Sequence, residues 1–129
     1  MRVPVSVIIP FRNHSAYLTE CLESIAAQTV EVGEVILVND DSTEPNIRKV
    51  LRTMVAPYPW VKIFHQKKSK GVAAARNLGA EKAKGKYLLF LDADDKIDPT
   101  FVEKTCFKLD QNPLLSFVYT HARFFGREE

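Results

Sequence analysis

The sequence predicts an α/β fold of three layers, α/β/α, built on a mostly parallel, Rossmann-like sheet. Short runs rich in β-branched residues alternate with segments whose apolar residues recur every three or four positions, and no internal repeat or low-complexity linker interrupts this order. The β runs are apolar on both faces, which is typical of strands covered by helices on each side. Strands separated by helices favour a parallel sheet with right-handed crossovers.

Each expected element has its own local signal. Strands are expected over residues 5–9, 34–38, 61–64, 87–91 and 115–120. Helices are expected to begin at Ser15, as a capping residue, at Pro45, at Gly71 and at Asp98, again as a cap before a proline. Gly85 ends the third helix, and the fourth reaches about residue 109.

Length, charge and cysteine content narrow the class of protein. A chain of 129 residues with 46% apolar residues predicts one folded unit over residues 1–129. The formal net charge is only +2 and the basic residues are spread out, so nucleic acid is not a favoured partner. Cys21 and Cys106 are far apart and are expected to be reduced core thiols of a cytoplasmic protein. No apolar run has membrane-spanning length, so peripheral membrane attachment would need another part of the native protein.

The most informative motif is a cluster of three carboxylates directly after the fourth expected strand, at Asp92, Asp94 and Asp95. In an extended backbone, residues two apart point to the same side about 6.6 Å apart. Asp92 and Asp94 are therefore expected to face one spot while Asp95 turns away or enters a loop. Their repulsion can be relieved by a divalent cation, by Lys or Arg, or by raised pKa values. Hard oxygen ligands suit Mg²⁺ or Mn²⁺.

Polar residues follow the other expected strands as well. They include Arg12 and Asn13 after the first strand, Asp40 after the second and the loop of residues 67–71 after the third. Ligands of open parallel sheets bind beyond the carboxyl ends of the strands, so these residues are expected to converge on one ligand with a base, a ribose and a diphosphate. Asp40 can accept from a base N–H, and Arg12 or Arg76 can offset phosphate charge.

Plainer explanations exist for several of these residues taken singly. Asp40 is at least as well explained as a turn or helix-capping residue. Arg76, on a helix, is more often a surface ion-pair residue. The small side chains of residues 71–79 let a helix pack closely on the sheet or let its amino end approach an anion, and close packing is the safer explanation.

Four motifs in this order resemble the nucleotide-sugar-binding, amino-terminal portion of family 2 glycosyltransferases with the GT-A fold. They are the opening strand through Pro10 and Asn13, the segment Val38-Asn39-Asp40-Asp41-Ser42-Thr43, the stretch from Gly71 to Tyr87, and Leu91-Asp92-Ala93-Asp94-Asp95. The resemblance implies transfer of a sugar, with inversion, from a nucleoside diphosphate donor, usually UDP-linked, to a saccharide or lipid-linked acceptor. It also implies a divalent cation, Mg²⁺ or Mn²⁺, and a role in cell-surface polysaccharide biosynthesis.

The same resemblance implies roles for individual residues. Asp40 would bind the base, Asp92 the ribose or the metal region, and Asp94 the cation. Residues Pro10 and Arg12 would line the nucleoside pocket, with Gly71 also at the nucleotide sugar and Arg76 near the base or phosphates. The family's acceptor site and general base come from a following segment, so the catalytic base is expected beyond Glu129 and the chain is expected to be a truncated, donor-binding part.

Three positions depart from the resembled pattern. Asp41 stands where Gly is frequent, Arg12 where an aromatic residue is frequent, and Ser69 where Asn is common. Asp41 would strain its turn if the backbone there needs a positive φ, and the Arg12 guanidinium could stack on a base. These departures bear on the identity of the donor more than on the class of reaction.

Three other classes of protein share parts of this pattern. The chain could be a non-catalytic module that binds nucleotide sugars. A nucleotidyltransferase typically carries a Gly-rich phosphate loop after its first strand, where this chain has Pro10-Phe11-Arg12-Asn13. A receiver-like signalling domain needs an acidic pair at that same place. The sequence therefore favours the glycosyltransferase over the last two.

Overall fold

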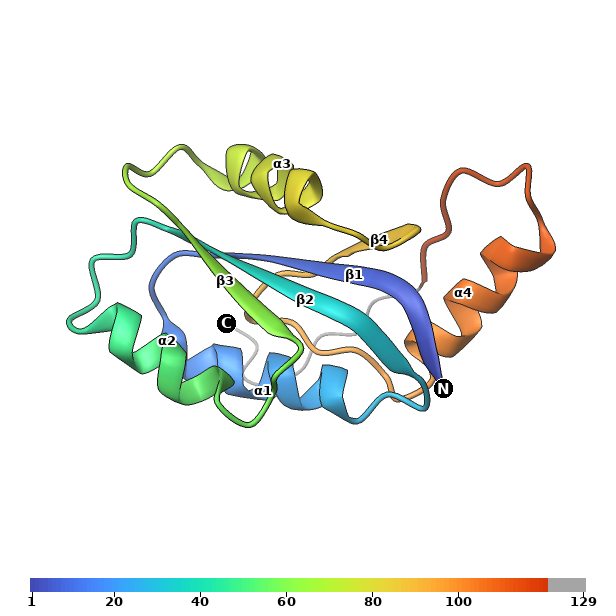
Figure 1. The fold of residues 1–129 in the computed structure, drawn as a ribbon, viewed down its shortest axis with the longest axis horizontal. Helices are drawn as coiled ribbons and strands as arrows, with labels where there is room; N and C mark the ends of the chain where they lie inside the picture. The colour runs from blue at the N-terminus through green and yellow to red at the C-terminus, as the bar shows by residue number, and fades with distance from the viewer. Residues whose placement is uncertain (121–129) are drawn as a thin grey trace, which may run out of the picture.

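A computed structural model describes residues 1–120 of the chain (Figure 1). Its elements follow one another in the order β1 (Arg2–Phe11), α1 (Ser15–Ala26), β2 (Glu31–Asp40), α2 (Ile47–Val55), β3 (Val61–Gln66), α3 (Val72–Lys82), β4 (Tyr87–Phe90) and α4 (Phe101–Gln111). The four strands form one parallel sheet in the order β3-β2-β1-β4. The expected three-layer α/β/α architecture is confirmed.

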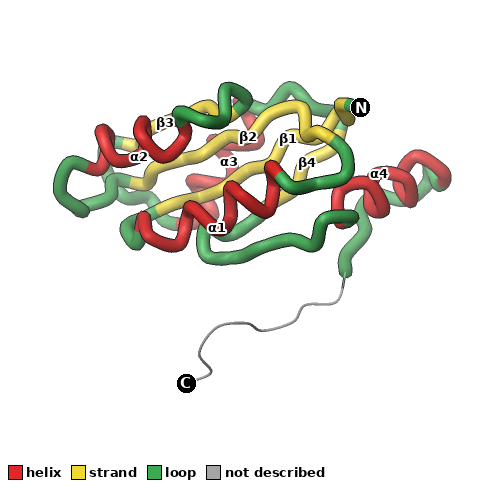
Figure 2. Tube along the Cα trace, turned by 90° about the horizontal axis from the view of Figure 1, so that it is seen from below, coloured by secondary structure: helices red, strands yellow, loops and turns green. Residues whose placement is uncertain are grey.

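The two faces of the sheet are covered by different helices. Figure 1 shows α3 on one face, and Figure 2 shows α1 and α2 on the other. Alternate residues of β1, such as Val7 and Ile9, enter the larger apolar core on the α1 face. Ile36 and Val38 of β2 form a smaller core under α3 together with Ala75. This alternation follows from the two-residue period of a strand and explains why the runs are apolar on both faces.

The close approach of α3 to the sheet depends on Gly79. A Cβ atom at this position would lie 2.5 Å from Cγ2 of Ile8, a separation that requires a shift of the side chain. Gly71 has a different requirement, because its φ is +90° and a Cβ there would have open space around it. Close packing therefore explains Gly79, as the sequence indicated, whereas Gly71 is needed for its backbone conformation.

Two expected helix caps are wrong. The residue preceding α1 is His14, in the left-handed conformation, and Ser15 is the first helical residue. The Ser15 hydroxyl donates instead to the carboxylate of Glu44, a residue distant in sequence. The last helix begins at Phe101, after Thr100, so Asp98 is not its cap. The main-chain oxygen of Asp98, not its side chain, contacts the start of this helix by accepting from Phe101 N at 3.0 Å.

The expected fifth strand is also wrong. Residues 115–120 form no strand, and within residues 1–120 β4 pairs with β1 alone. Phe117 and Tyr119 are 72% and 87% exposed. A run of β-branched and aromatic residues has strand propensity, but pairing with a sheet edge is a tertiary event that composition does not decide.

Candidate functional site

The carboxyl ends of the four strands bring together most of the residues singled out in the sequence. Pro10 is half-buried near the end of β1, and Arg12 is exposed in the loop that follows. Asp40 ends β2, Gly71 precedes α3, and Arg76 lies on α3. Asp92 and Asp94 follow β4. The parallel sheet thus places all of these residues at one edge, as its topology predicts.

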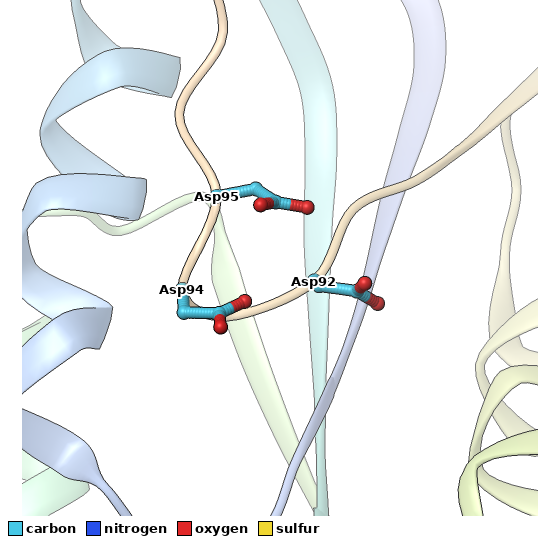
Figure 3. Close-up of side chains that lie close together, drawn as sticks. All are labelled: Asp92, Asp94 and Asp95. Atoms are coloured by element: carbon cyan, nitrogen blue, oxygen red, sulfur yellow. The ribbon is translucent and has the colours of Figure 1, made fainter. Parts of the chain in front are cut away.

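The acidic cluster contains three members. Oxygen atoms of Asp92, Asp94 and Asp95 all lie within 4.8 Å of one another, and the three side chains extend to the same side of the loop (Figure 3). Of the two alternatives expected for Asp95, it does enter a loop, but its side chain does not turn away from the other two. The expectation that it turns away assumed an extended backbone, whereas the chain forms a turn in which Asp95 N donates to Asp92 O at 3.0 Å.

Two of the expected ways to relieve the repulsion among the carboxylates, an arginine partner and a raised pKa, are present. Arg76 Nη2 donates to Asp92 Oδ1 at 3.2 Å, in an ion pair whose side chains are 43% and 53% exposed. Partial burial, followed by the charges of Asp94 and Asp92, raises the pKa of Asp95. Burial and the same three carboxylates raise the pKa of the Cys21 thiol, which lies behind the loop, to about 12. The loop thus carries concentrated negative charge, and Arg76 brings an opposite charge to it at Asp92.

The donor set fits a small divalent cation. Three carboxylates offer hard oxygen ligands, and two oxygens on opposite sides of Mg²⁺ would lie about 4.2 Å apart. The 4.8 Å limit within the cluster is close to this value, so small side-chain rotations would suffice. Because all three residues are exposed, they also leave room for water and for oxygens of a bound ligand.

Asp40 lies at the other end of the site, beneath the loop between β3 and α3. Its carboxylate accepts from Ser69 Oγ at 3.0 Å, from Lys70 N at 2.9 Å and from Gly71 N at 3.1 Å. The residue is only 4% exposed. Asp40 therefore holds the loop that leads into α3, largely through main-chain donors just before the helix.

Helix α3 connects the two halves of the site. The main-chain nitrogen of Gly71, at its start, donates to Asp40, and Arg76, five residues later, donates to Asp92. Five residues correspond to about 8 Å along a helix axis. The buried Nε of Arg76 has no hydrogen-bond partner among the described residues. Helix α3, a single rigid element, thus fixes the position of the Asp40 carboxylate relative to the acids after β4.

A polar network that sequence reasoning missed shapes the loops after β1 and β2. Asn39 Oδ1 accepts from Ser42 Oγ at 2.6 Å, Ser42 Oγ accepts from Asn13 N at 2.9 Å, and Asn13 Oδ1 accepts from Thr43 N at 2.9 Å. On its other side, Asn39 Nδ2 lies 3.0 Å from Nδ1 of His65. The available signal was the position of Asn39 and Asn13 at or just beyond the carboxyl ends of β2 and β1.

Burial and the nearby Arg48 lower the pKa of His65. The lower pKa favours the neutral imidazole, whose Nδ1 can accept from the Asn39 amide. Asp41, in the same region, has a φ of +53°, which is the conformation that would favour Gly. Aspartate tolerates this region better than most residues because its short side chain bonds locally. The turn after β2 is thus formed without the Gly common in the resembled motif.

Comparison with known proteins identifies the family. The family model described as glycosyl transferase family 2 matches residues 6–128. An uncharacterized glycosyltransferase of Escherichia coli K12, YibD, is 40% identical over 99 residues, covering 77% of this chain and 28% of the relative. Chondroitin synthase of Escherichia coli is 37% identical over 128 residues, covering 98% of this chain and 18% of the relative. The chain thus spans less than a third of either relative.

Solved structures agree with this assignment. The crystal structure of residues 1–349 of S. aureus TarS in complex with UDP-GlcNAc has a TM-score of 0.75 at 29% identity, covering 86% of this chain and 32% of that one. A mannosyltransferase from Pyrobaculum calidifontis, in complex with GDP-Man and Mn²⁺, has a TM-score of 0.67 at 26% identity, covering 74% and 29%. Among residues 1–120, no helix combines the length and apolar character needed to cross a membrane. The chain belongs to glycosyl transferase family 2 and has its GT-A fold.

Proposed function

We propose that this chain forms the donor-binding part of an inverting glycosyltransferase that moves a sugar from a UDP-linked donor to an acceptor hydroxyl. The observation that carries the proposal is the three-carboxylate cluster after β4. Helix α3 joins this cluster to the buried carboxylate of Asp40 at the end of β2. The relatives' glycosyltransferase names and the UDP-GlcNAc and GDP-Man in neighbouring structures support it.

We assign parts of the donor to parts of the site. Asp40 accepts from the nucleobase, with Pro10 and Arg12 along the nucleoside, and Arg12 is exposed and free to stack on the base. Asp92 and Asp94, joined by Asp95, hold Mg²⁺ or Mn²⁺, and Asp92 lies toward the ribose. Arg76 and the first turn of α3, just after Gly71, face the phosphates, where a positive side chain and helix N–H groups favour anions.

In the proposed reaction, an acceptor hydroxyl of a saccharide or lipid-linked acceptor attacks the anomeric carbon while the bond to the diphosphate breaks. A bound divalent cation supplies charge stabilisation to the departing diphosphate. The described residues bind and orient the donor, and we assign the general base to none of residues 1–120.

Calorimetry with UDP, with and without Mn²⁺, tests the metal-dependent site. We expect Mn²⁺-dependent binding that Asp94→Ala weakens at least about tenfold, because one charged ligand is lost. Asp98→Ala is the matched control, since Asp98 is an exposed acid of the same loop outside the cluster, and it should bind like the parent chain. Equal UDP affinity without metal, or with Asp94→Ala, would contradict the proposal.

A turnover assay separates an enzyme from a non-catalytic sugar-nucleotide module. The assay requires the longer protein that carries this segment, together with an acceptor. Release of UDP that depends on both the acceptor and Asp94 supports the transferase, whereas binding without turnover supports the module.

A further inference from the structure

The inference concerns how many hydrogen bonds Asp40 can still accept. Its carboxylate is 4% exposed and already receives three donors, from Ser69 Oγ, Lys70 N and Gly71 N. Two carboxylate oxygens offer about four acceptor positions in total. The loop therefore fills three of them and leaves about one for a ligand.

Nucleobases differ in the number of adjacent donors they present. The imide edge of uracil has one ring N–H between two carbonyl oxygens. Guanine has a ring N–H next to an amino group, and these two donors together match both oxygens of a carboxylate. A carboxylate with one free position can satisfy uracil, whereas guanine would keep an unpaired buried donor, which is unfavourable.

We propose that Ser69 is a positioning residue that sets nucleobase specificity: by occupying one acceptor position of Asp40, it leaves a single position that suits the imide edge of uracil rather than guanine. This inference rests on the proposed function. It assigns Ser69 a role that acts through Asp40, not through contact with the reacting atoms.

Ser69 is the position at which a substitution can change the number of acceptor positions left open on Asp40. Lys70 and Gly71 contact Asp40 through main-chain N–H groups, which most substitutions retain, whereas Ser69 uses its hydroxyl. Ser69 is also exposed and lies outside the helices and strands, so its substitution leaves the sheet and its cores intact.

The test compares Ser69→Ala with the parent chain by calorimetry with UDP and GDP in the presence of Mn²⁺. The parent should prefer UDP. Removal of the hydroxyl opens a second position on Asp40 Oδ2, so the ratio of UDP affinity to GDP affinity should fall about tenfold, the scale of one hydrogen bond to a charged group. Ser69→Thr keeps the hydroxyl and should restore the parent ratio.

Lys68→Ala is the control for general disturbance of the loop. Lys68 is exposed and does not contact Asp40 among the described residues, so any loss of charge there should change UDP and GDP binding by the same factor. A parent chain that binds GDP as tightly as UDP, or a ratio unchanged in Ser69→Ala, would overturn the inference.

The same titrations separate the two proposals. Metal-dependent UDP binding with an unchanged ratio in Ser69→Ala removes the role of Ser69 and leaves the proposed function in place. Failure of the parent chain to bind either diphosphate with Mn²⁺ removes both.

Discussion

Strand β2 carries a buried carboxylate near each end, and the two are held in different ways. Glu34, near the amino end, is 6% exposed, and Asp40, at the carboxyl end, is 4% exposed. Glu34 accepts from Ser6 Oγ at 2.6 Å, Lys84 N at 2.6 Å and Lys62 Nζ at 3.2 Å, which links three strands of the sheet. Asp40 is instead held by a single loop, through the Ser69 hydroxyl and the main-chain N–H groups of Lys70 and Gly71.

This difference indicates that the amino end of the sheet has a structural role and that the carboxyl end is suited to a ligand. At the amino edge, every partner of Glu34 lies on or beside the sheet, and Ser6 Oγ also accepts from Gly85 N at 2.8 Å. A cavity of about 610 Å³ opens there, lined among others by Trp60 and Lys62, but its carboxylate is already paired. At the carboxyl ends of the strands, three exposed acids lie close together, and one of them, Asp92, pairs with Arg76. The cluster of negative charge is thus a better guide to the ligand-binding end of the sheet than the size of a cavity.

The largest expected effect is on stability, at the amino edge. Glu34→Ala leaves the donors of Ser6 and Lys84 without their acceptor, so the free energy of unfolding should fall by about 2–3 kcal/mol. Urea denaturation followed by circular dichroism measures the change. UDP binding by the folded fraction should be unaltered; a Glu34→Ala chain as stable as the parent would remove the contrast between the two edges.

The next effect is on binding, at the carboxyl edge. Asp40→Ala removes the proposed base acceptor, and UDP affinity should fall about thirtyfold, with a stability loss of about 1 kcal/mol because the freed loop donors are near solvent. Calorimetry and urea denaturation on the same sample give both quantities. If Asp40→Ala mainly unfolds the chain and spares UDP affinity in the folded fraction, Asp40 is structural like Glu34.

A smaller effect is expected from pH. Burial opposes ionisation of Glu34, but hydrogen bonds from Ser6, Lys84 and Lys62 outweigh it and lower the pKa of Glu34 below its ordinary value of 4.5. A lowered pKa means that the ionised form stabilises the fold above pH 4.5 and that this contribution is lost as the pH falls through the folded-state value. Glu34→Gln should therefore flatten the acid limb of the stability curve, as measured by urea denaturation at several pH values.

An acid limb of the same slope in Glu34→Gln would show that other carboxylates cause the pH dependence. Glu44→Gln is a useful comparison, because hydrogen bonds from Ser15 lower the pKa of Glu44, which is only half-buried. Its removal should alter the acid limb less than removal of the buried Glu34.

The smallest expected effect concerns Lys62. Its side chain is 47% exposed, so solvent screens the ion pair with Glu34. Lys62→Met should lower the free energy of unfolding by less than about 1 kcal/mol. A loss in urea denaturation as large as that of Glu34→Ala would show that the lysine charge, not the Ser6 and Lys84 hydrogen bonds, stabilises the amino edge.

Local sequence signals predicted much of the site. Asp92 and Asp94 follow β4, and Asp40 ends β2, so the parallel topology alone places them at the same end of the sheet. Gly71 was expected to open a helix of small residues, and it does directly precede α3, although the reason is its positive φ. These predictions succeeded because each depends on neighbours in the chain and on one rule of sheet topology.

Other features could not be read from neighbours in the chain. Ser69 and Asp40 are 29 residues apart, and Ser6 and Glu34 are 28 apart, yet both pairs are hydrogen-bonded. The Ser15 hydroxyl contacts Glu44 instead of capping its own helix. Such side chains have several partners of similar chemistry available, and the choice among them is made when strands and loops pack together.

By itself, the sequence determined the alternation of strands and helices, the parallel sheet and the edge at which acidic and basic residues collect. These follow from periodicity, from residues that begin or end elements, and from the direction of parallel strands. Only the folded structure decided that residues 115–120 stay out of the sheet and that one loop fills most of the acceptor capacity of Asp40. Both depend on which distant groups meet, and packing decides that, not local propensity. Asp95 joins the acid cluster for a more local reason, the turn in which its N–H donates to Asp92 O.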